Sequence, residues 1–77
     1  MNNSQNMPLK ILHAYEDLYF EEGKGKIFDD IFSRYFAPLA IDRHMDLYDA
    51  LVLLSTRHRA QFDEMVKELK AHSLLSD

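Results

Sequence analysis

The chain has 77 residues, 9 Lys and Arg against 13 Asp and Glu, a formal net charge of −4, and no cysteine. This length allows one domain at most, because domains usually run to about 100–150 residues. The lack of cysteine excludes disulfides, thiolate metal sites and thiol nucleophiles, and the acidic balance argues against nucleic acid, whose phosphates normally meet a basic face. Small domains without disulfides or metals often gain stability by self-association, which favours a homodimer.

Membrane insertion and secretion are not expected from the sequence. Residues 1–7 are polar and do not resemble a secretory leader with an apolar centre and a cleavage site. The longest apolar run, residues 50–54, falls far short of the roughly 18–20 residues of a membrane span. We therefore predict a soluble, cytoplasmic protein.

The first helix is predicted over residues 8–22, after an N-terminal arm. Residues 1–7 are rich in Asn, Ser and Gln and predict a disordered arm, which leaves residues 8–77 as a single helical domain. Asn6 is placed to cap the helix, and Pro8 falls in its first turn, where the missing N–H is harmless. Gly23 is a natural left-handed residue at the helix end. One face of this helix is apolar: Ile11, Leu12, Tyr15, Leu18 and Tyr19.

The second helix is predicted over residues 26–36, and its apolar stripe is unusually aromatic and wide. Pro38 disfavours the α conformation at Ala37 and so sets the end of the helix. The rings either fill a core between the first two helices or form a face that binds a partner, since Tyr and Phe are enriched at interface cores. The width of the stripe favours a second contact surface. The candidate partner-binding residues are Tyr19, Phe28, Phe32, Tyr35 and Phe36.

Residues 46–69 lie within the longest stretch without glycine or proline. A single helical stripe runs through it: Leu47, Leu51, Leu54, His58, Phe62, Met65 and Leu69. Asp42 or Asp46 can cap its start, and residues 73–77 are expected to fray. As one helix of roughly 36 Å, it would exceed what the first two helices can cover, and its far half would need a second chain.

The alternative is a break near Ser55-Thr56, which would fold the stretch back into a compact four-helix monomer. Ser and Thr are weak stops without Gly or Pro, so the continuous form is favoured. No alternating strand pattern occurs anywhere, and the β-branched residues are scattered. The predicted fold is therefore all-α: a bundle of three helices with a long last one, or four if that helix breaks.

The compact basic cluster Arg57-His58-Arg59 supports an alternative function, nucleic-acid binding. Such a patch needs support from other cations, and the same predicted helix begins with Asp46 and Asp49, which would repel phosphates. His58 lies in the apolar stripe and is expected to be a partly buried histidine.

A helical metal-binding module is a further alternative, because Glu64, Glu68 and His72 follow one another at i,i+4 spacing. Solvated helix faces explain these residues better, so neither a metal site nor a cofactor is predicted. Catalysis has less support still, since no serine lies in a glycine-flanked elbow and the paired carboxylates have nothing to raise their pKa. We predict that the chain is not an enzyme and has no small-molecule substrate.

These observations together predict a small helical protein–protein interaction module, a regulator or adaptor. It would act by burying an aromatic helix face against a protein partner or a second copy of itself. No residue pattern identifies the partner.

Overall fold

The structure, a computed structural model, describes residues 6–42 and 44–76. Their elements are α1 (Met7–Leu18), α2 (Lys24–Phe36), the short 3₁₀ helix η2 (Ala37–Leu39), α3 (Leu47–Arg57) and α4 (Arg59–Ala71). No strand occurs in these two ranges, and the prediction of an all-α helical bundle is confirmed.

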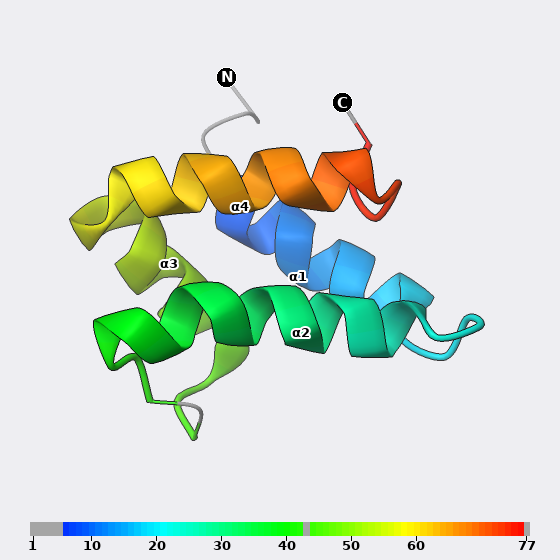
Figure 1. Cartoon of the computed structure of the whole chain (residues 1–77), viewed down its shortest axis with the longest axis horizontal. Coiled ribbons are helices and arrows are strands. Elements are labelled where there is room, and N and C mark those ends of the chain that lie inside the picture. The colour runs from blue at the N-terminus through cyan, green and yellow to red at the C-terminus, as the bar shows by residue number, and fades with distance from the viewer. Residues whose placement is uncertain (1–5, 43, 77) are drawn as a thin grey trace.

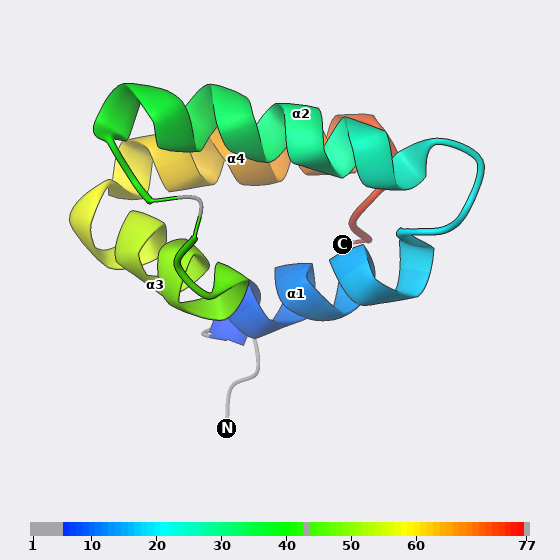
Figure 2. The same ribbon diagram turned by 90° about the horizontal axis from the view of Figure 1, so that it is seen from below.

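The four helices form two layers (Figure 1). One layer pairs α2 with α4, and the other pairs α1 with α3, as the view from below shows (Figure 2). The α1–α2 connection lies at one end of the molecule and the α3–α4 junction at the opposite end. None of the described helices combines the length and apolar character that crossing a bilayer requires.

A single core lies between the layers, and every helix contributes to it. Among the described residues no polar or charged side chain is buried, so apolar burial is the main force that holds the helices together. The buried apolar residues are Ile11, Phe28, Ile31, Phe32, Phe36, Ile41, Ala50, Leu51, Leu54, Phe62, Met65, Leu69, Leu74 and Leu75.

Helix α1 starts one residue earlier and ends four residues sooner than predicted. Residues 1–5 of the predicted arm lie outside the described residues, and Met7, the last residue of that arm, begins α1 and packs against the core. Asn6 holds the N-cap position without a side-chain capping bond. Gly23 is left-handed, as predicted (φ 81°), but it comes directly before α2 rather than directly after α1.

The stretch over residues 46–69 is broken at His58, so the favoured continuous helix is wrong. His58 has φ −135° and ψ 58°, outside the helical region, and it both ends α3 and starts α4. The hydroxyls of Ser55 and Thr56 donate to the carbonyl of Val52 at 2.8 and 2.9 Å. Hydrogen bonds from Ser or Thr side chains to the backbone of the preceding turn often bend helices. The break therefore lies just after the predicted Ser55-Thr56 position.

The start of α3 follows the capping prediction for Asp46 and not that for Asp42. The backbone amide of Tyr48 donates to Asp46 Oδ2 at 3.1 Å, which satisfies one free amide of the first turn. Asp42 instead accepts from the backbone amide of His44 at 2.8 Å and holds a turn before the helix.

The C-terminal segment does not fray over the residues that the structure describes, because Leu74 and Leu75 are buried. Ser73 is left-handed (φ 61°), and the amides of Ser73 and Leu74 donate to the carbonyls of Lys70 and Leu69 at 3.0 and 2.9 Å. This is a Schellman ending, in which the residue after the left-handed one packs on the last turn. The prediction failed because the leucines gain more by burial than the chain end loses in freedom.

The end of α2 and η2 has the same geometry with alanine in the left-handed position. Ala40 has φ 58°, and the amide of the following Ile41 donates to the carbonyl of Phe36 at 3.1 Å. A side chain in this conformation costs about 1–2 kcal/mol, which glycine avoids.

We expect Ala40→Gly to raise the free energy of unfolding by about 0.5–1 kcal/mol in urea titrations. Ala14→Gly, in the middle of α1, should lower it by about 1 kcal/mol, and equal signs for the two would contradict this account.

Candidate interaction surface

The five predicted partner-binding residues are divided between the core and the surface. Phe28, Phe32 and Phe36 are at most 2% exposed and belong to the core. Their rings are inaccessible to a partner in the folded chain, so the alternative of a core of large rings holds for them. Tyr35 is half-buried, and Tyr19 is 38% exposed. A partner that approaches the aromatic face can therefore reach only its margin.

The buried rings continue to the surface through Tyr15 of α1. Its ring centroid lies 5.4 Å from that of Phe28 and 5.5 Å from that of Phe32, and its hydroxyl donates to Asp29 Oδ1 at 3.0 Å. On the outer side, Tyr15 lies edge-on to Tyr19 at 5.1 Å. These contacts fix the end of α1 against α2 and give the outer rings a rigid base.

Phe20 is the most exposed large apolar side chain that the structure describes, at 94%. Its ring packs edge-on against Tyr19 with centroids 5.0 Å apart. Together with Tyr15, Glu16 and Tyr19 it lines an open depression of about 270 Å³. We call these four residues the aromatic corner; it lies where α1 runs into the α1–α2 connection, at the right of Figure 1.

Phe20 is absent from the sequence-based candidates, although a signal for it exists. It follows Ile11 by nine residues, which on a helix is a rotation of about 180°. An aromatic residue on the side of a helix opposite its apolar stripe does not belong to the face that covers the core. Phe20 differs from the buried rings in its angular position around the helix, and not in its residue type.

Tyr35 is held by an intramolecular group, Glu68 of α4. The Tyr35 hydroxyl donates to Glu68 Oε1 at 2.9 Å, and Arg34 pairs with the other carboxylate oxygen. The hydrogen bond from Arg34 lowers the pKa of Glu68, and the Tyr35 hydroxyl lowers it further. Burial raises the pKa of Tyr35, and its bond to the carboxylate adds to that effect. The polar tip of Tyr35 thus serves the α2–α4 contact.

Glu68 should make the stability of the protein sensitive to acid. Its folded pKa lies below the unfolded value of about 4.3, so its contribution is present above that pH and is lost as the pH falls through the folded pKa. We expect Glu68→Gln to lower the free energy of unfolding at pH 7 by about 1 kcal/mol, through the weakened bond to the Tyr35 hydroxyl. The loss should shrink at pH 3. Urea titrations at both pH values measure it, and Glu64→Gln, which should show no such difference, is the control.

The basic cluster Arg57-His58-Arg59, the candidate for nucleic-acid binding, lies at the opposite end of the molecule from the aromatic corner. Arg59 of this cluster already has partners within the chain. Arg59 Nε donates to Asp63 Oδ1 at 3.1 Å, and the guanidinium lies 5.8 Å from the centroid of the Phe62 ring. Arg57 is exposed, and His58 is half-buried at the helix junction.

The metal-binding alternative loses its central ligand, because the Glu68 carboxylate is bonded to Arg34 and Tyr35. Over residues 6–42 and 44–76 no group of three or more His, Asp or Glu side chains is placed to hold a metal ion.

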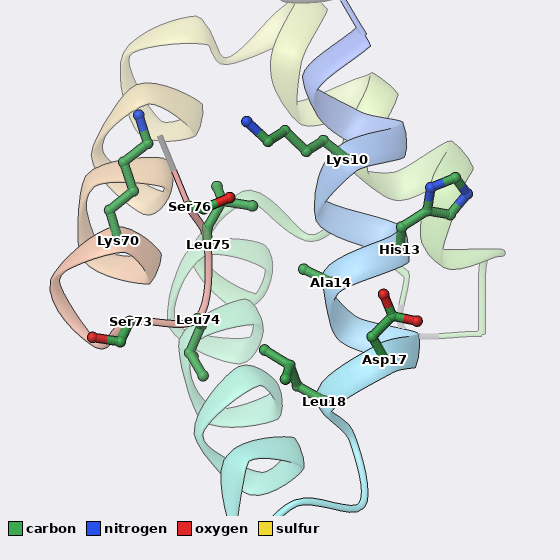
Figure 3. A pocket seen from close by; sticks show the side chains of 10 residues that line it. All are labelled: Lys10, His13, Ala14, Asp17, Leu18, Lys70, Ser73, Leu74, Leu75 and Ser76. Atoms are coloured by element: carbon green, nitrogen blue, oxygen red, sulfur yellow. The ribbon is translucent and has the colours of Figure 1, made fainter.

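An open groove of about 600 Å³ runs between α1 and the C-terminal segment (Figure 3). Lys10 and Lys70 stand on its opposite walls, and Leu18 and Leu74 lie at its other end. His13 points away from the space between the walls. The charged groups of this groove do not converge on one point, which distinguishes the groove from an ion-binding site.

Comparison with known proteins gives no relative: no family model, no curated protein and no solved structure matches the chain.

Proposed function

We propose that this protein is a small helical protein–protein interaction module, a regulator or adaptor, and that its contact surface is the aromatic corner. The observation that carries the proposal is the 94% exposure of Phe20 beside Tyr19. Full burial of a phenylalanine side chain stabilises by about 1.5–3 kcal/mol, which a partner that covers this ring would gain. Aromatic side chains on a rigid base are typical of the residues that dominate binding energy.

One of the two arguments for a homodimer no longer applies. It rested on a long helix whose far half needed a second chain, whereas Phe62, Met65 and Leu69 of α4 are buried by this chain itself. The other, the small size of a domain without disulfides, is unaffected. A cytoplasmic location and a regulatory role stay predictions. The proposal therefore rests on the aromatic corner.

The test compares two variants that each remove an exposed apolar side chain. Phe20→Ser alters the aromatic corner, and Met45→Ser alters an exposed residue outside it. Both should melt within a few degrees of wild type, since surface changes usually shift stability by less than about 0.5 kcal/mol. In affinity capture from the native host, with light scattering to detect self-association, Phe20→Ser should lose a stoichiometric complex that wild type and Met45→Ser form. Equal complexes with all three, or a complex with none, would overturn the proposal.

A further inference from the structure

The residues next to the aromatic corner along the chain are mostly acidic. Four carboxylates lie within the seven residues that contain its exposed rings: Glu16, Asp17, Glu21 and Glu22. All four are exposed, and only Glu21 forms an ion pair with a described residue, a 3.5 Å contact with Lys24 that is itself open to solvent. An exposed pair of this kind is weak. With Lys24 and Lys26 included, residues 16–26 carry four carboxylates and two lysines, so this segment has an excess of negative charge.

We infer that the aromatic corner takes a basic segment of another protein, one in which Lys or Arg lies next to an apolar side chain; this rests on the proposed function. Glu16 lines the same depression as Tyr15, Tyr19 and Phe20. A Lys or Arg side chain laid there would place its aliphatic stem on the rings and its charge beside the carboxylate. The ring faces attract the same cation. The apolar neighbour on the segment would cover Phe20.

A second copy of this chain fits the aromatic corner poorly. In a two-fold symmetric contact the same surface faces itself, which would bring the four carboxylates of each copy together. A head-to-tail contact would require a basic surface at the other end of the molecule. There, Arg57 and Arg59 are followed by Asp63 and Glu64, and Arg59 is already paired with Asp63. Nucleic acid and anionic lipid would meet the same repulsion as a second copy.

The test uses two synthetic amphipathic helical peptides of equal length, one of leucine and lysine and one of leucine and glutamate. Fluorescence anisotropy at low and moderate salt measures their binding to the full chain. We expect the lysine peptide to bind and the glutamate peptide not to. Phe20→Ser should weaken binding of the lysine peptide about tenfold or more, as for a central aromatic contact. Glu16→Gln should weaken it several-fold and flatten its salt dependence, while Glu64→Gln on α4 should do neither.

The failures of the two proposals are distinguishable. Equal binding of both peptides, or lysine-peptide binding that neither Phe20→Ser nor Glu16→Gln reduces, would overturn the basic-partner inference. Self-association lost in Phe20→Ser would also overturn it and would name a second copy as the occupant. In each of these cases a Phe20-dependent complex in the capture experiment would leave the interaction surface standing. Without such a complex, both proposals fall.

Discussion

Replacing Phe32 by alanine is expected to lower the free energy of unfolding by about 3–5 kcal/mol, the usual loss for a buried phenylalanine. Phe32 is 1% exposed and lies against three rings, those of Tyr15, Phe28 and Phe36. A cavity at this point removes contacts with both α1 and α2. At 0.05–0.15 kcal/mol per residue the whole chain is stable by only about 4–12 kcal/mol, so this single substitution should remove a large fraction of its stability.

The matched control is the same substitution at Phe20, which is 94% exposed. Phe20→Ala should change the free energy of unfolding by less than about 0.5 kcal/mol. Circular dichroism during urea titration measures both variants. Similar losses for Phe20→Ala and Phe32→Ala would contradict the assignment of one ring to the core and the other to the surface.

Gly25→Ala is expected to destabilise the protein, although alanine favours helices. Gly25 is buried in the first turn of α2, and a Cβ placed on it would lie 2.5 Å from the carbonyl oxygen of Tyr19 and 2.8 Å from its ring. The backbone of the α1–α2 connection would have to move, and such overpacking costs about 1–3 kcal/mol or more. The gain in helix propensity, about 1 kcal/mol, offsets part of this. We expect a net loss of about 1 kcal/mol or more.

Gly23→Ala separates this steric effect from backbone conformation. Gly23 has open space around it but a left-handed backbone, so alanine there should cost about 1–2 kcal/mol from strain alone. Thermal and urea unfolding of both variants measure the difference. An increase in stability for Gly25→Ala, the usual result for a helical glycine with space beside it, would refute the close approach of α1 and α2.

Local patterns predicted those parts of the fold that depend on local chemistry. The stripes of the first two helices contain the residues that are buried, such as Ile11 and Phe28, and Asp46 caps its helix as its residue type indicates. The break at His58 depends on what α4 gains by folding back, which is the burial of Phe62 and Met65 against other helices. Within residues 46–69 Ser55 and Thr56 mark where a break can occur, but the stripe is equally regular in both forms and does not decide between them.

The candidate site was harder to predict than the fold. Residue type indicates aromatic side chains in general as candidates, and most of the five candidates are buried because α2 is covered on its aromatic face by α1 and α4. Which ring stays outside depends on helix phase and on where α1 ends, at Leu18 instead of residue 22. The surroundings of Phe20 depend on the path of the α1–α2 connection, which no local pattern specifies.

The single residue between α3 and α4 has a consequence for how this chain meets other copies. If His58 took helical dihedrals, α3 and α4 would form one rod of roughly 36 Å and α4 would leave the core. Two such rods could then exchange their α4 helices, each filling the place vacated in the other, which is a domain swap. The continuous helix that the sequence favours would be the exchanged dimer, and the broken helix the closed monomer. Protein concentration would then set the balance between them.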